Sequence, residues 1–169
     1  VTLQGLQENL IVSPTVKNTP IIDYKLKNVT IKFKDSLEEN TTYTLDFGKA
    51  LVDVNESNMA KNFRFIFSTG NIIDNGTYNG HVVIAATGKI DSTLIVVLHN
   101  NVNDTSIYKN TPRYYTRVDG KGNFSFKNLA PGKYAAYVIP TNFSRKYDDS
   151  TNYFGFLNAP VTVSEDRKS

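Results

Sequence analysis

Four oxygen-bearing side chains lie within six residues of one another and could form a metal site. Asp53, Asn55, Glu56 and Asn58 have the ligand types and the density that calcium-binding loops use. An EF-hand loop would also need a glycine at its sixth position and a distal glutamate, whereas Asn58 is followed by Met59. The pattern therefore fits either a weak calcium site or a polar turn that leads into the next strand.

The sequence has two histidines, His81 and His99, which are the other candidates for catalysis or metal binding. Zinc binding and acid–base catalysis need two or three converging ligands and a group that orients the imidazole. With no cysteine in the chain, two histidines in strand-like segments are more typical of structural residues. The sequence also has no Gly-x-Ser-x-Gly nucleophile motif and no glycine-rich phosphate loop. We therefore predict no catalytic residue, no cofactor and no enzyme activity.

The charge distribution argues against nucleic-acid binding, and the hydropathy argues against a membrane-spanning helix. The formal net charge is +3, from 19 Lys and Arg against 16 Asp and Glu, and no basic run occurs, so we expect no nucleic-acid binding. The longest apolar run, 94–98, has the length of a buried strand, whereas a membrane-spanning helix needs about 20 residues. Because the chain begins at Val1 and not at Met, we expect a piece of a longer protein.

The elements that must position any site are strands, and the clearest of them lie between 119 and 138. Asp119–Gly122 predicts a turn, after which Phe124 and Phe126 point to one face of a strand. Pro131–Gly132 predicts a second turn, and Tyr134 resumes the buried face. We also expect strands at 77–86 and 93–98, followed by an Asn- and Asp-rich loop at 100–110. Further strands are expected at 112–118, 153–156 and 161–163.

In the first half, alternating apolar residues predict strands at 28–34, 43–47 and 62–67. Phe63, Phe65 and Phe67 share one face of the last of these strands, and we expect all three rings in the core. Leu37 precedes Tyr43 by six residues across a polar turn. This spacing is typical of a tyrosine corner, in which the Tyr hydroxyl bonds to an upstream backbone group.

The stretch from Leu37 to Gly48, followed by Phe63–Gly70, resembles bacterial Ig-like domains of the surface-layer type. The resemblance covers about Leu3 to Gly70 and implies an exported protein, since such domains are common in exported proteins of Bacteroidetes. Members of that family begin with a strand ahead of the position of Val1, so we expect this domain to be truncated at its N-terminus.

The second half resembles prealbumin-like domains, also described as carboxypeptidase regulatory-like or Cna B-type domains. The resemblance covers most of Gly80 to Val163. It implies a fold and says almost nothing about function, because such modules accompany enzymes, receptors and adhesins alike. The motif that carries it is Asp119-x-x-Gly122-x-Phe124-x-Phe126-x-x-Leu129-x-Pro131-Gly132-x-Tyr134.

Together these patterns predict an all-β chain of two tandem antiparallel β-sandwiches, Ig-like and then prealbumin-like. We expect the first domain at 1–70, a linker at 71–76 and the second domain at 77–169. The residues expected to hold the two structures together are Leu37, Tyr43, Phe63, Phe65, Phe67, Phe124, Phe126, Leu129, Gly132 and Tyr134.

The function expected from this architecture is a non-catalytic structural and protein-interaction module of a larger exported cell-envelope protein. It would be periplasmic or associated with the outer-membrane surface, where a lipid anchor could hold it. Its expected partners are other domains of the same protein and cell-envelope proteins. The alternative is a carbohydrate-binding module, in which exposed tyrosines such as Tyr114, Tyr115, Tyr137 and Tyr147 stack on a glycan.

Overall fold

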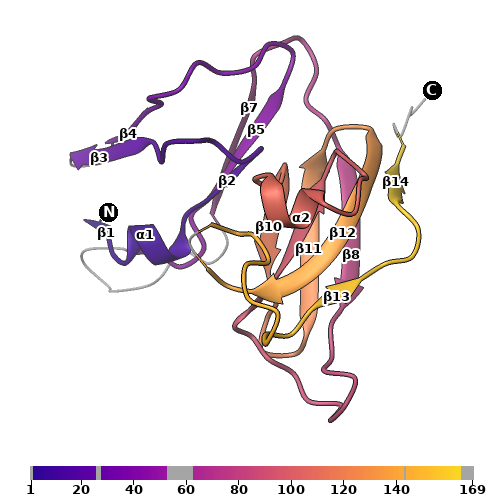
Figure 1. Ribbon diagram of the computed structural model, residues 1–169. Coiled ribbons are helices and arrows are strands. Elements are labelled where there is room, and N and C mark those ends of the chain that lie inside the picture. Colours follow the sequence, from indigo (N-terminus) through magenta and orange to yellow (C-terminus); the bar gives the residue numbers. More distant parts are fainter. Residues whose placement is uncertain (1, 26–27, 53–62, 143, 165–169) are drawn as a thin grey trace. The chain divides into compact units, whose positions relative to one another are not determined.

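The structure, a computed structural model, describes residues 2–25, 28–52, 63–142 and 144–164. The chain is nearly all β and divides into two compact units, 1–73 and 74–169 (Figure 1). The fold class predicted from the sequence, an all-β chain of two tandem antiparallel β-sandwiches, is confirmed. None of the helices among the described residues has the length and apolar character needed to cross a membrane.

The first unit is built from short antiparallel strands. The described pairings are β1 with β6, β3 with β4, and a three-stranded sheet in the order β2-β5-β7. Its elements are β1 (Thr2–Leu3), α1 (Leu6–Asn9), β2 (Ile11–Ser13), β3 (Ile21–Lys25), β4 (Asn28–Lys32), β5 (Thr42–Asp46), β6 (Leu51–Val52) and β7 (Arg64–Ser68).

The core of this unit gathers around β5 and the residues that follow it. Leu45 and Phe47 are fully buried, and Leu10, Val12 and Leu51 pack with them. The half-buried residues Ile22, Ile31, Phe33 and Phe67 cover this cluster. The alternation that predicted strands 28–34 and 43–47 therefore reflects one apolar face in each strand.

Tyr43 forms the predicted tyrosine corner. Its ring is 3% exposed and stacks on Phe67 with 5.5 Å between ring centroids. Its hydroxyl accepts a hydrogen bond of 3.0 Å from the backbone N–H of Glu38, and Leu37 next to it is half-buried. The hydroxyl therefore ties the turn before β5 to the strand itself.

The prediction that Phe63, Phe65 and Phe67 all lie in the core is wrong for two of them. Phe67 is half-buried, but Phe63 and Phe65 are 47% and 46% exposed. Among the described residues β7 pairs with β5 alone, so it lies at the edge of its sheet. Rings on an edge strand have neighbours on one side, and alternation cannot tell such a strand from a central one.

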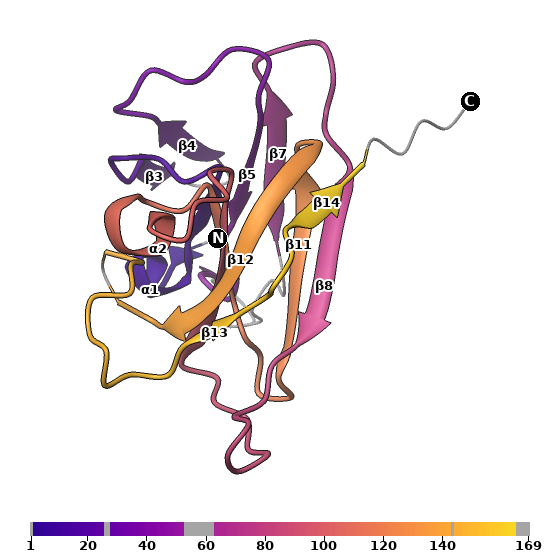
Figure 2. The same ribbon diagram turned by 45° about the vertical axis from the view of Figure 1, so that its right-hand side comes forward.

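The second unit is a larger sandwich. One sheet has the order β10-β9-β12-β13, with β14 also paired to β12, and the other pairs β11 with β8 (Figure 2). Its elements are β8 (Gly76–His81), β9 (Leu94–His99), α2 (Ser106–Lys109), β10 (Tyr114–Arg117), β11 (Asn123–Leu129), β12 (Gly132–Pro140), β13 (Gly155–Phe156) and β14 (Val161–Val163).

The predicted motif residues of this unit lie where the alternation placed them. Phe124, Phe126, Leu129 and Tyr134 are all buried in the core between the two sheets, beside Leu94, Val96 and Leu98 of β9. The Tyr134 hydroxyl donates a hydrogen bond of 2.8 Å to the carbonyl of Ala130, across the turn that Gly132 completes.

The first predicted turn of this motif is also present. The carboxylate of Asp119 accepts hydrogen bonds from the backbone N–H groups of Lys121 and Asn123, each 2.8 Å long. Gly122 has φ of 85°, a conformation that glycine adopts without the cost of a Cβ atom.

Two second-half predictions differ from the structure. The strand expected at 77–86 ends at His81, and the apolar residues 82–84 lie outside any strand. The loop expected at 100–110 contains the one-turn helix α2, whose residues Ser106 and Ile107 are buried. The Asn- and Asp-rich composition indicated turn chemistry, and it gave no sign that Ile107 packs inward.

We predict that replacing Tyr43 with Phe lowers the free energy of unfolding by about 1 kcal/mol, the contribution of one partly buried hydrogen bond. The matched control is Tyr24→Phe, because the Tyr24 hydroxyl accepts a hydrogen bond from Thr2 at an exposed position. That control should change the free energy by less than about 0.5 kcal/mol. Urea unfolding measures both, and equal losses would show that the Tyr43 hydroxyl adds nothing beyond packing.

The linker predicted at 71–76 can be tested by limited proteolysis. Cleavage should occur there first, because Ile72 and Ile73 are 77% and 53% exposed and lie outside any strand. The 100–110 stretch should be cut later, since α2 anchors it through Ser106 and Ile107. Mass spectrometry of the first fragments identifies the site, and a first cut inside either unit would contradict the predicted boundary.

Candidate binding cleft

The second unit has a cleft with a volume of about 590 Å³. This volume lies in the range of small-molecule and peptide-side-chain sites, about 300–1,000 Å³. The cleft lies between two strands that are sheet edges in the described part of the chain, β8 and β13. Its lining comes from residues 78, 80–86, 96, 124, 136–138 and 153–157.

One end of the sandwich is closed, and the cleft opens at the other. A Cβ atom at Gly76 would overlap the Val163 side chain, so β8 and β14 approach closely there. On β12, Tyr134 pairs with Val161 and Tyr137 pairs with Phe156. Two residues of β12 lie between its paired positions, but four residues lie between Phe156 and Val161 on the opposite side. These extra residues form a bulge that interrupts the strand opposite β12. The strand edge that faces β8 is therefore continuous where β14 lies near Gly76, and it is interrupted between β14 and β13.

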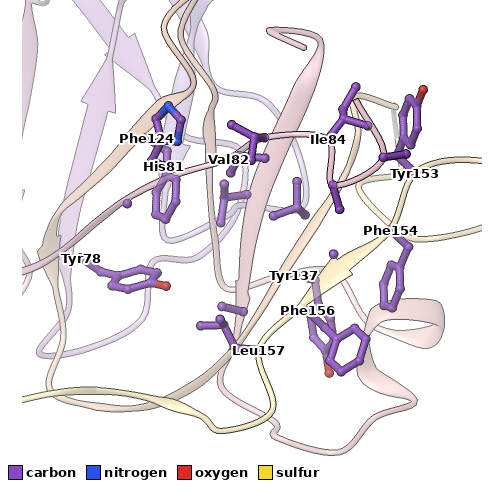
Figure 3. Close-up of a pocket in the computed structure, with 18 residues that line it drawn as sticks. Tyr78, His81, Val82, Ile84, Phe124, Tyr137, Tyr153, Phe154, Phe156 and Leu157 are labelled. Atoms are coloured by element: carbon purple, nitrogen blue, oxygen red, sulfur yellow. The ribbon is translucent and has the colours of Figure 1, made fainter. Parts of the chain in front are cut away.

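The two walls of the cleft differ in chemistry (Figure 3). Tyr137, Phe154 and Phe156 form an aromatic wall, with successive ring centroids 5.9 Å apart and nearly parallel planes. The opposite wall is aliphatic and includes Val82 and Ile84.

The floor of the cleft belongs to the core of the sandwich. Val96 and Ala136 are buried core residues, and Val138 packs against them. Phe124 also reaches the cleft, where it packs with the ring of Tyr78 at 5.3 Å. The cleft is therefore an opening into the hydrophobic core, and whatever fills it extends that core.

Among the residues that the structure describes, no Asp, Glu, Lys or Arg side chain lines the cleft. Burial raises the pKa of Tyr78. Burial is also the main cause that raises the pKa of Tyr137, and Asp104 and Tyr108 add to it electrostatically. Both hydroxyls therefore stay neutral at physiological pH. Nε2 of His81 lies 2.9 Å from the carbonyl of Lys121, which occupies one side of that imidazole. The described lining is mostly apolar, a composition that suits an apolar ligand.

The rim of the cleft is exposed to solvent and apolar. Phe156 and Leu157 are 62% and 53% exposed, and Tyr153 and Val83 are about as open. The strand expected at 153–156 is shorter in the structure, where Gly155 and Phe156 alone of these four residues pair with β12. The signal available in the sequence was Pro160, which disfavours continuous pairing after Phe156.

Comparison with family models divides the chain in two. Residues 1–69 match the bacterial Ig-like domain family, and residues 74–168 match the fn3-like family described as polysaccharide lyase family 4, domain II. The second match covers more than half of the chain. The chain belongs to this fn3-like family. Neither the comparison with curated proteins nor that with solved structures gave a match.

The matches bear on the resemblances read from the sequence. A bacterial Ig-like domain at the N-terminal side is confirmed. The match of the second domain does not test its assignment as prealbumin-like, which stays a prediction. Domains of these two kinds are typically non-enzymatic, and bacterial Ig-like domains are usually found in exported proteins.

The calcium prediction concerns residues that the structure does not describe. Asp53, Asn55, Glu56 and Asn58 lie outside the described residues, so the calcium hypothesis stays untested. Within 2–25, 28–52, 63–142 and 144–164, no three His, Cys, Asp or Glu side chains are grouped closely enough to hold a metal ion.

The tyrosines proposed for glycan stacking are not the exposed ones. Tyr114, Tyr115 and Tyr137 are 2–7% exposed, and Tyr147 is half-buried. Tyr115 accepts a hydrogen bond of 3.2 Å from Arg145, whose guanidinium also lies 4.2 Å from the ring centroid. These side chains are occupied by packing within the fn3-like unit, where Tyr114 packs edge-on against Tyr134 and Phe154 packs against both Tyr137 and Tyr147.

His99 is a buried structural residue, as the sequence suggested. It is 1% exposed, its ring packs edge-on to Tyr137 at 5.8 Å, and its Nε2 has no hydrogen-bond partner among the described residues. Burial lowers the pKa of His99 from its ordinary 6.5 to about 4, because the charged imidazolium would lose its hydration.

This shift predicts a pH dependence of stability. Between pH 6.5 and about 4 the unfolded chain binds a proton at His99 and the native chain does not. The stability present above pH 6.5 should therefore fall as the pH drops, by about 1.4 kcal/mol per pH unit in mid-window. His99→Phe should flatten this slope and the exposed-site control His81→Phe should keep it. Denaturant unfolding at several pH values measures it, and parallel slopes for all three proteins would contradict the assignment.

Proposed function

We propose that this chain is a non-catalytic structural and protein-interaction module of a larger exported protein of the cell envelope. The observation that carries the proposal is the exposed apolar rim of the cleft, formed by Val83, Tyr153, Phe154, Phe156 and Leu157. Clustered exposed apolar side chains are typical of binding surfaces, whereas single ones are ordinary. Ig-like and fn3-like domains commonly serve as structural or interaction modules, which supports the same reading.

The location in the envelope is part of the proposal. A bacterial Ig-like domain at 1–69 supports export, since such domains are usually found in exported proteins. We place the protein in the periplasm or at the outer-membrane surface, with other domains of the same protein and envelope proteins as neighbours. The name of the second family refers to polysaccharide lyases, and we propose no lyase chemistry for this chain.

Glycan binding remains the alternative function. The exposed, stacked rings of Phe154 and Phe156 resemble a platform for a sugar, whereas Tyr114, Tyr115 and Tyr137 are buried. Sugars also need amide, carboxylate or guanidinium groups that bind hydroxyls, and the lining of the cleft has none of these side chains. The composition of the cleft thus favours a protein partner over a glycan.

The proposal is tested in cells that produce the full-length protein. A photo-crosslinking amino acid replaces Phe156 at the rim or, as the control, the exposed Val102, which lies outside the cleft. We expect the protein in the periplasmic or membrane fraction, with protein adducts from position 156 and few or none from position 102. A cytosolic location, or equal adducts from both positions, would contradict the proposal.

A further inference from the structure

We propose that the cleft binds an extended segment of a partner protein, which adds as a strand between β8 and β13 and inserts alternate uncharged apolar side chains. This inference rests on the proposed function and names the site and the kind of partner. It depends on three independent features of the fn3-like unit: its free strand edges, a lining without Asp, Glu, Lys or Arg among the described residues, and an apolar β-branched run that continues from β8.

The first feature is the pair of strand edges that flank the cleft. In the part of the chain that the structure describes, β8 pairs only with β11, and β13 pairs only with β12. Each strand thus has one side on which its backbone N–H and C=O groups meet no neighbouring strand. A peptide in the extended conformation can supply those partners, whereas an acyl chain or another purely apolar ligand cannot.

The second feature is the match between the cleft and apolar side chains. The floor consists of core residues such as Val96 and Ala136, and in the described part of the chain no Asp, Glu, Lys or Arg lines the walls. A charged side chain inserted there would lose its hydration without gaining a partner. Because successive residues of a strand point to opposite sides, every second residue of the bound segment would face the cleft and be uncharged.

The third feature is the apolar β-branched run that follows β8. Val82, Val83 and Ile84 have β-branched side chains and continue directly from β8, yet the strand ends at His81. All three residues line the cleft, and Val83 is 48% exposed. The backbone N–H groups of Val82 and Ile84 already donate to the carbonyls of Gly122 and Lys89, so this run would contact the added strand through its apolar side chains.

The test uses a phage-displayed library of random nine-residue peptides, selected on the purified chain of 169 residues. We expect enriched peptides with uncharged apolar residues at alternate positions. Val83→Asp should weaken their binding by about tenfold or more, since it places a charge at the rim of a mostly apolar cleft. The matched control is Val102→Asp, because Val102 is also 48% exposed and lies outside the cleft. Enriched peptides that bind both variants equally, or no enrichment at all, would overturn the proposal.

Hydrogen exchange distinguishes strand addition from other modes of binding. A selected peptide should slow amide exchange at 78–84 or 155–157, because new backbone hydrogen bonds protect those groups. Monolauroylglycerol serves as the neutral lipid probe. If it displaces the peptides and binds more tightly, with no slowing of exchange by either ligand, the cleft is a lipid site and the proposal is wrong.

The outcome is separable from that of the proposed function. Peptide selection and hydrogen exchange use purified protein, so a cytosolic location in cells would contradict envelope function and leave the strand-addition result standing. Envelope location with adducts at position 156, but without alternating apolar peptides, would overturn strand addition alone.

Discussion

The close approach of β8 to β14 at Gly76 is the constraint on which the shape of the second unit depends. Only a residue without a side chain lets the two sheets meet there, with Val163 and the carbonyl of Leu129 against it. From this closed end the edges diverge, because the bulge between Phe156 and Val161 breaks the strand that would otherwise continue along β8. The cleft is the consequence of one tight contact and one interrupted strand.

The core explains why such an opening is tolerated. Phe124, Phe126, Leu129 and Tyr134 pack with β9 in a cluster that holds the two sheets together. The cleft reaches this cluster at Val96 and Ala136, so a ligand would extend an existing core and need no rearrangement of the fold. Sandwich domains have exposed edge strands, and most of them prevent association there with charged side chains or with a loop or helix that covers the edge. Here the edge regions carry aromatic and aliphatic side chains, a composition that favours association.

Local patterns in the sequence predicted much of the fold. Alternation placed Phe124 and Phe126 inside, and the spacing from Leu37 to Tyr43 indicated the hydrogen bond from Glu38. Where a prediction failed, the missing information was which strands lie at sheet edges. Phe63 and Phe65 alternate as core residues do, yet an edge strand leaves them half exposed. The cleft was not predicted, because it depends on the pairing register between β12 and residues 155–163.

The central claim is that the edge between β8 and β13 is an open site that accepts a strand. A crystal structure of the chain with a bound peptide tests it most directly. The account predicts an extended peptide whose backbone pairs with β8 or β13, with alternate apolar side chains over Val96 and Ala136. A peptide seated elsewhere on the chain, or a cleft closed by Phe154 and Phe156 with the peptide outside, would contradict it.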